Sequence, residues 1–346
     1  MPKINSFKDV IMDKFYDDIF ITLSDFIEEN PAKLDCNTHH VQNPDDATLS
    51  DFEIITVRIS KTKEHQIDFD VVVSAEIEIE EEVKRDREVD SVEQWFRVSC
   101  SAILDDGISD FSIFGINIYN RQREKSENRL SEYLVPKMDK TKLDEIAQEF
   151  LVKYYPEALQ EPLAIHPRTV AERMGLSVIE TRITKNGTAF GQVFFSDWET
   201  NIFDSETGAF STIKISRGTI LVDPCVYFLR TVGSKNNTII HECVHWHLHK
   251  EYFELEKLYN VDAKAISCEV FEGTKTENKW TPLDTMEWQA NVLAPRILMP
   301  KKQAKQLAEE LIEKYRRVLQ TDDMANIMES VVSERISFGP GDILSR

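Results

Sequence analysis

The sequence predicts an α+β protein with two domains, and three observations support this prediction. Apolar residues recur every three or four positions in some segments and every second position in others, which indicates both helices and strands. A nearly uninterrupted polar stretch, 121–132, separates a strand-rich part of the chain from a helix-rich part. The length of 346 residues is enough for two hydrophobic cores.

The first domain is predicted to span residues 1–125 and to begin with an amphipathic helix. Apolar residues follow helical spacing from Phe7 to Phe26, and Asn30-Pro31 ends the helix. Four runs with a period of two come next, and this alternation predicts half-buried antiparallel strands. These runs lie at 55–59, 75–79, 95–102 and 113–118.

Residues 126–138 are predicted to form a polar linker, and a second domain is predicted over residues 139–346. This domain opens with an amphipathic helix whose apolar face runs through 143–154. Pro167 and Gly175 delimit a short second helix, because proline suits the first turn and glycine suits the position after the last. Strands are predicted at 177–181, 192–195 and 219–222, and later helices at 302–316 and 323–336.

Charge and composition exclude several functional classes. The net charge of −20 opposes binding to phosphate backbones or anionic lipid, so neither direct nucleic-acid binding nor membrane binding is expected. It favours a basic protein partner or substrate, or serves solubility alone. No apolar run reaches membrane-spanning length, and the amino end has no secretory pattern. The five cysteines are scattered and form no CxxC pair, which favours a reducing cytoplasm.

The segment 238–249, which reads TIIHECVHWHLH, carries the predicted chemistry. Within it, His241, Glu242 and His245 form an HExxH motif. Four residues turn a helix by about 400°, so the two imidazoles project side by side and can bind Zn²⁺. Glu242 lies about 100° around the helix from His241, off the ligand face but within reach of a water held on the metal. We therefore predict that His241 and His245 are metal ligands and that Glu242 is the catalytic base.

A second register remains open. His249 is one turn beyond His245, so these two residues form another pair at helical spacing. Trp246 follows His245 where a glutamate would be needed, which favours the His241–His245 pair. Whether His249 contributes to the site is not decided by the sequence. His247 is predicted to be exposed on another face.

A catalytic zinc needs a third protein ligand and an open position, and Glu287 is the favoured candidate. The extended motif HExxHxxGxxH is excluded, because Leu248 stands at the position of its glycine and Glu251 at the position of its last histidine. A glutamate from a second helix is the remaining common solution, and Glu287 opens a helical segment, MEWQANVLAPRILMP. The alternative is that Glu287 only favours the amino end of that helix through its charge.

The segment that contains Glu287 is predicted to approach the HExxH helix closely. Ala290 and Ala294 follow at three- and four-residue spacing, and their small side chains allow this approach. Asn291 lies one turn after Glu287 and is a candidate hydrogen-bond partner that orients the ligands. Pro295 is expected to kink or end the helix.

These motifs resemble those of the ImmA/IrrE metallopeptidases over residues 139–300. The resemblance implies a zincin-like fold, with the HExxH helix packed on a small mixed or antiparallel sheet. It implies zinc bound by His241, His245 and Glu287, with Glu242 activating water. Many members have an aromatic residue where Asn237 stands, and many carry a helix-turn-helix module that the amino end here lacks. The family's T-x-x-HE-x-x-H, E-x-x-AN and Leu-Met-Pro motifs stand here as Thr238 with His241-Glu242 and His245, Glu287 with Ala290-Asn291, and Leu298-Met299-Pro300.

The resemblance implies a cytoplasmic zinc endopeptidase whose substrate is a regulatory protein such as a basic helix-turn-helix repressor. Zinc-bound water deprotonated by Glu242 would attack a peptide carbonyl, and a further hydrogen-bond donor would stabilise the oxyanion. Tyr227, Tyr252 and Tyr259 are candidates for this donor, and the sequence does not choose among them. The alternative is a non-catalytic zinc-containing module for sensing or protein binding, which would have no need for Glu242.

Overall fold

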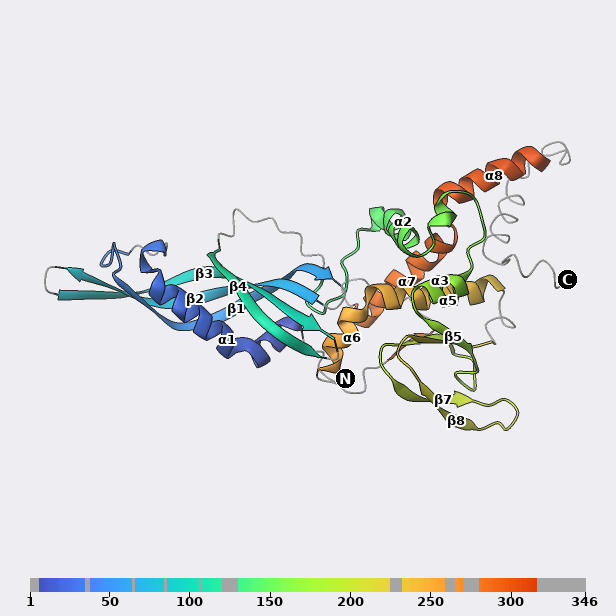
Figure 1. Cartoon of the computed structure of the whole chain (residues 1–346), viewed down its shortest axis with the longest axis horizontal. Helices are drawn as coiled ribbons and strands as arrows, with labels where there is room; N and C mark the ends of the chain where they lie inside the picture. The colour runs from blue at the N-terminus through green and yellow to red at the C-terminus, as the bar shows by residue number, and fades with distance from the viewer. Residues whose placement is uncertain are drawn as a thin grey trace. The chain divides into compact units, whose positions relative to one another are not determined.

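The protein has a mixed α+β fold, which confirms the predicted α+β class. Seven α-helices and three sheets lie in the part of the chain that the structure describes. The chain divides into two compact units, Met1–Lys137 with Glu254–Asp262, and Met138–Phe253 with Ala263–Arg346 (Figure 1). No helix among the described residues is long and apolar enough to cross a membrane. The computed structural model describes residues 6–34, 38–63, 66–83, 86–105, 107–119, 130–224, 232–258, 265–269 and 280–315.

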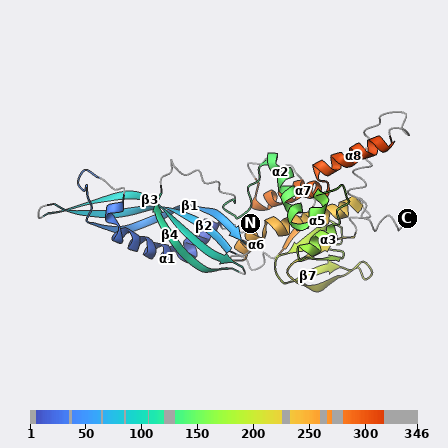
Figure 2. The same ribbon diagram turned by 45° about the horizontal axis from the view of Figure 1, so that its top comes forward.

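The first unit is a four-stranded antiparallel sheet with one long helix along it (Figure 2). Helix α1 (Phe7–Glu29) begins at a capping box in which the side chains of Ser6 and Asp9 each accept a hydrogen bond from the other's backbone N–H. It ends at Asn30, as predicted. The sheet has the order β1-β2-β3-β4, and its strands are β1 (Asp46–Lys63), β2 (Gln66–Val83), β3 (Asp86–Leu104) and β4 (Ile108–Ile118).

The core of the first unit lies between α1 and one face of this sheet. Phe7 and Phe26, near the two ends of the helix, meet Phe69 and Phe96 of the sheet edge to face, at centroid distances of 5.1 and 6.1 Å. The four alternating runs all lie in these strands. Every second residue is buried in the runs at 75–79 and 95–102, whereas the apolar residues of the runs at 55–59 and 113–118 are mostly half-buried. The strands extend well beyond the runs.

A short segment distant in sequence also belongs to the first unit. Residues Glu254–Asp262 fall in this unit, although they follow the HExxH segment along the chain. Leu255 is 1% exposed and packs in the core of the first unit, with Leu258 against it. The first unit is therefore discontinuous in sequence.

The second unit contains a mixed four-stranded sheet with the order β10-β6-β9-β5. Strand β5 (Ser177–Glu180) pairs parallel to β9 (Thr219–Val222), while β6 (Ala189–Phe194) pairs antiparallel to β9 and to β10 (Ala265–Glu269). All four residues of β9 are buried, as the run ILVDP predicts. A separate hairpin joins β7 (Trp198–Phe203) to β8 (Phe210–Ile215).

Helix α5 (Val232–Leu248) is central to the second unit, because it packs on the sheet at β6 and β9 and also against α3 and α7 (Figure 1). Helix α3 begins at Pro167, and Gly175 follows it with φ +75°, as predicted. The remaining helices are α2 (Leu143–Tyr154), α3 (Pro167–Arg173), α6 (Lys250–Lys257), α7 (Pro282–Leu298) and α8 (Lys301–Tyr315).

Helix α7 continues past Pro295, so of the two outcomes expected there, a kink or an end, the end is excluded. The helix begins at a capping box formed by Thr281 and Asp284 and continues to Leu298. The proline removes one backbone N–H, and the carbonyl that loses its partner belongs to Asn291, an exposed residue. The predicted helix at 323–336 lies outside the described residues.

Candidate metal centre

Three histidines occupy successive turns of one helical face. His241 and His245 lie within α5, and His249 follows at its end, where its backbone N–H donates to the carbonyl of His245 at 3.0 Å. The spacing of four residues brings each ring over the next. None of the three side chains is more than 1% exposed, so any charge or lone pair on them must be matched inside the protein.

Glu287 on α7 completes a candidate metal-binding triad with His241 and His245. The Nε2 atoms of the two histidines lie 2.9 Å apart. One carboxylate oxygen of Glu287 lies 3.3 Å from Nε2 of His241, and the other lies 3.3 Å from Nε2 of His245. Helices α5 and α7 pack together, and this packing joins residues that are distant in sequence.

The geometry of this triad fits a small divalent cation. Ligand atoms at about 2.0–2.1 Å from a tetrahedral metal lie roughly 3.3 Å from one another, and the observed separations are 2.9, 3.3 and 3.3 Å. The contacts of Glu287 are close but poorly aligned, so neither of its oxygens has a hydrogen bond among the described residues. Acceptor atoms thus converge in a buried place, which is what a cation requires.

Ionisation also suits a cation. Burial alone would raise the pKa of Glu287, but the contacts with His241 and His245 outweigh it and lower the pKa to about 2. Burial lowers the pKa of His245 to about 4, although Glu287 pulls it upward. At neutral pH, therefore, Glu287 is a carboxylate and His245 is a neutral imidazole, the forms in which these side chains bind metals.

Glu242 is completely buried, and its carboxylate lies against strand β6. Burial and then repulsion from Glu287 raise its pKa well above the ordinary value. The backbone N–H of Val193 opposes this shift, but it does not meet ordinary hydrogen-bond geometry, so both carboxylate oxygens remain without a hydrogen bond among the described residues. An unsatisfied buried carboxylate beside the triad is the arrangement expected of a functional group.

Gly191 makes room for Glu242 and was not singled out from the sequence. A Cβ atom at this position would lie 2.6 Å from Oε1 of Glu242 and 2.6 Å from Cγ2 of Thr238, closer than side chains tolerate. The sequence signal is a glycine inside a strand, which often marks a close approach of another group. Here the strand backbone of β6 approaches α5 directly at the HExxH motif.

His249 contacts the triad member His245 at the ring nitrogen opposite the one that faces Glu287. Its Nδ1 lies 2.9 Å from Nδ1 of His245, and its Nε2 lies 2.8 Å from Oε1 of Gln289 on α7. His249 is therefore a partner of His245 and not a member of the triad. Burial and then His245 lower the pKa of His249 well below its ordinary value. Gln289 makes the contact that was considered for Asn291, which is exposed.

The other candidates lie elsewhere. His247 is on a different face, as predicted, but it is half-buried, with its Nδ1 3.2 Å from the hydroxyl of Tyr154. Tyr252 is 3% exposed, and Tyr227 and Tyr259 lie outside the described residues. The structure therefore does not select a tyrosine for oxyanion stabilisation.

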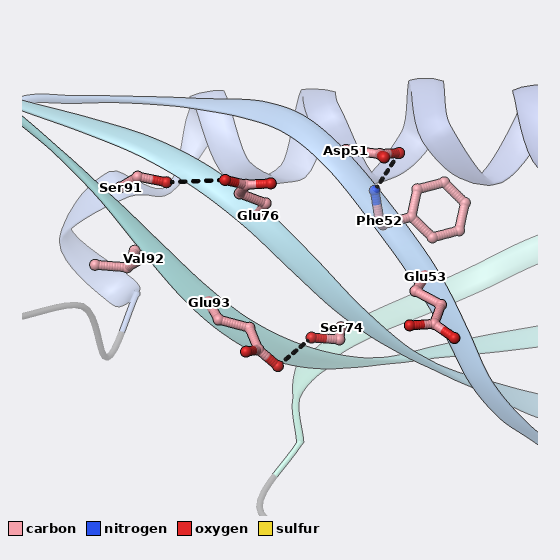
Figure 3. A pocket seen from close by; sticks show the side chains of 8 residues that line it. All are labelled: Asp51, Phe52, Glu53, Ser74, Glu76, Ser91, Val92 and Glu93. Carbon is pink, nitrogen blue, oxygen red and sulfur yellow. Dashed lines mark hydrogen bonds between the residues drawn. The ribbon is translucent and has the colours of Figure 1, made fainter.

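A separate hollow of about 460 Å³ lies in the first unit, on strands β1, β2 and β3 (Figure 3). Asp51 pairs with Glu76 across β1 and β2, and Glu76 pairs with Glu93 across β2 and β3. Hydroxyl groups of Ser91 and Ser74 donate to Glu76 and Glu93. The hollow is acidic, and all of its lining residues belong to the first unit, whereas the triad belongs to the second.

Comparisons with known proteins give little to set beside this geometry. No family model matches the chain, and no curated protein matches it. Among solved structures, an Ntf2-like protein involved in plasmid conjugation is similar at 12% identity, with 52% of this chain and 75% of that chain covered, and a TM-score of 0.11. A similarity this weak carries no argument about the fold or the function.

Proposed function

We propose that this protein is a zinc-dependent endopeptidase with a zincin-like catalytic unit, of the kind found in the ImmA/IrrE metallopeptidases. The observation that supports the proposal most directly is the convergence of His241, His245 and Glu287 at 2.9–3.3 Å, with the carboxylate of Glu242 unsatisfied beside them. Two histidines, a glutamate ligand and a free glutamate are the donor set of a hydrolytic zinc site.

Each residue has a separate role in this proposal. His241, His245 and Glu287 hold Zn²⁺, which when bound polarises a peptide carbonyl and makes water a stronger acid. Glu242 accepts the proton of the attacking water and returns it to the leaving amine. Burial serves this role, because it leaves the carboxylate poorly solvated and therefore a stronger base.

The proposed substrate is a basic regulatory protein in the cytoplasm, such as a helix-turn-helix repressor. The net charge of −20 favours encounters with a basic partner. Purified wild-type protein loaded with zinc should cleave such a repressor at a defined site, detected by mass spectrometry of the fragments. Binding without cleavage would favour the alternative, a zinc-containing sensing or protein-binding module.

Metal analysis tests the proposed ligands independently of any substrate. Wild-type protein should bind one zinc per chain, and His241→Ala and Glu287→Ala should each lose most of it, because removing a ligand leaves the site incomplete. His247→Ala is the matched control, since this histidine lies on the same helix but outside the triad. Full zinc occupancy in Glu287→Ala would refute the third ligand.

A further inference from the structure

A buried hydrogen-bonded chain leads from the triad to helix α7. Nδ1 of His245 faces Nδ1 of His249 at 2.9 Å, and Nε2 of His249 faces Oε1 of Gln289 at 2.8 Å. The three side chains are at most 1% exposed, so water does not compete for these bonds. The opposite ring nitrogen of His245, Nε2, faces His241 and Glu287.

The end of this chain determines where every proton lies. An amide oxygen can only accept a hydrogen bond, so Nε2 of His249 must carry the proton that is donated to Gln289. A neutral imidazole then has a bare Nδ1, which must accept from Nδ1–H of His245. His245 is left with an unprotonated Nε2, and its lone pair points at the triad.

We propose that His249 and Gln289 are positioning residues that hold His245 in the Nδ1–H tautomer and so present its Nε2 to a divalent metal. This proposal rests on the metal site proposed above and adds what orients one of its ligands. Buried partners of this kind fix both the tautomer and the plane of a ligating imidazole. Helix α7 thus supplies a ligand, Glu287, and two residues later the acceptor that orients another ligand.

His241 provides the contrast. Its Nδ1 is buried and has no hydrogen-bond partner among the described residues. The hydrogen-bonded chain therefore sets the tautomer and orientation of only one of the two ligating histidines. The effect of breaking these hydrogen bonds should appear at His245. The hydrogen-bonded chain also accounts for the burial of a glutamine and a third histidine that hold no place in the triad.

The hydrogen-bonded chain from His245 through His249 to Gln289, called the relay below, is tested by the zinc affinity of matched variants. Zinc affinity is measured by competition with a chromogenic chelator. Gln289→Met keeps the length of the side chain but removes the acceptor, and it should weaken zinc binding about 10- to 100-fold, as should His249→Phe. Gln289→Glu retains an acceptor and should therefore bind zinc more tightly than Gln289→Met. His247→Phe changes a histidine that is not part of this relay and should bind zinc with wild-type affinity. Equal zinc affinity in Gln289→Met and the wild type would overturn the proposal, and so would equal losses in Gln289→Met and Gln289→Glu.

The tautomers can be read directly without metal or substrate. Long-range ¹⁵N–¹H spectra of metal-free protein with labelled histidines, at pH 8, should show His245 protonated on Nδ1 and His249 protonated on Nε2, with signals assigned by His249→Phe and His247→Phe. A proton on Nε2 of His245 would mean that the amide group of Gln289 donates, and this would overturn the proposal. A wild-type protein that binds no zinc would refute the proposed function. In that case the tautomers measured in metal-free protein would by themselves show whether His249 and Gln289 hold His245 in the Nδ1–H form.

Discussion

The surroundings of Glu242 are those expected of a catalytic residue and not of a structural one. Its side chain is completely buried, has no hydrogen bond among the described residues, and lies beside the carboxylate of Glu287. A residue kept only for packing would be expected to be apolar there, because a buried unsatisfied carboxylate costs stability. Its role should therefore be visible as a separation between activity and metal binding.

Glu242→Gln should retain zinc and lose turnover by about 10²–10⁴-fold or more, because an amide cannot accept the proton. Its free energy of unfolding should be unchanged or higher, since the substitution removes repulsion from Glu287. The measurements are zinc content, denaturant unfolding and cleavage of a repressor substrate. Glu149→Gln makes the same chemical change at an exposed position outside the triad and should leave all three unchanged. Wild-type cleavage by Glu242→Gln would contradict the water-activation mechanism.

Gly191→Ala should disturb the same carboxylate from the other side. The added methyl group would lie 2.6 Å from Oε1 of Glu242 and 2.6 Å from Cγ2 of Thr238, so these side chains or the elements that carry them must shift. Overpacking of this kind typically costs about 1–3 kcal/mol of the free energy of unfolding, and we expect a loss of turnover as well. Denaturant unfolding curves measure the first effect.

Gly115→Ala is the control for this prediction. Gly115 also lies in a strand, β4, but an added Cβ would lie 4.0 Å from the nearest atom, the Cβ of Ser99, which is ordinary contact. This substitution should change stability little, or raise it by removing a flexible glycine. Equal losses in the two variants would show that the close approach to Glu242 is not what requires Gly191.

At the scale of elements, the pairing of α5 with α7 creates the candidate site. Neither helix carries the whole triad, and their close approach brings Glu287 to the two histidines. Ala290 and Ala294, the small residues predicted to let α7 approach the HExxH helix closely, are completely buried. The spacing of the helices should therefore control the site.

Ala290→Leu should weaken zinc binding and lower the free energy of unfolding by about 1–3 kcal/mol, because the larger side chain must push α7 from its neighbours. Asn291→Leu adds bulk to the next residue, which is exposed, and should preserve zinc affinity. Both are measured by chelator competition and denaturant unfolding. Wild-type zinc affinity in Ala290→Leu would show that the site does not depend on this helix contact.

At the scale of the whole molecule, the triad and the relay belong entirely to the second unit. His241, His245 and His249 lie within Met138–Phe253, and Glu287 and Gln289 lie within Ala263–Arg346. The first unit, in contrast, includes Glu254–Asp262, whose Leu255 is 1% exposed. Cutting the chain between the units should therefore leave the site complete and expose an apolar segment.

A fragment of residues 138–346 should bind one zinc with an affinity close to that of the full chain. It should also aggregate more readily, because Leu255 loses the core in which it is buried. Leu255→Glu should restore solubility to the fragment, and the same substitution in the full chain should be destabilising, since it buries a charge. Sedimentation and zinc analysis measure these effects. A soluble, folded fragment that binds no zinc would mean that the first unit completes the site.

Local patterns in the sequence sufficed for much of this structure. Period-two runs located the four strands of the first sheet, and helical spacing located α1, α2 and α8, because each pattern follows from which side of an element is buried. The side-by-side placement of His241 and His245 also follows from four-residue spacing alone. Of the kink or end expected at Pro295, the end is excluded, because α7 passes through it, and the carbonyl that loses its partner belongs to the exposed residue Asn291.

The sequence by itself thus determined the α+β class, the HExxH pair and Glu287 as the candidate third ligand. Only the tertiary structure decided that His249 bridges His245 and Gln289 and is not a member of the triad, that Gly191 makes room for Glu242, and that the first unit is discontinuous. The physical reason is the range of the interactions. Periodicity records the local choice of a buried face, whereas these contacts join residues at least 40 positions apart, whose meeting depends on how whole elements pack.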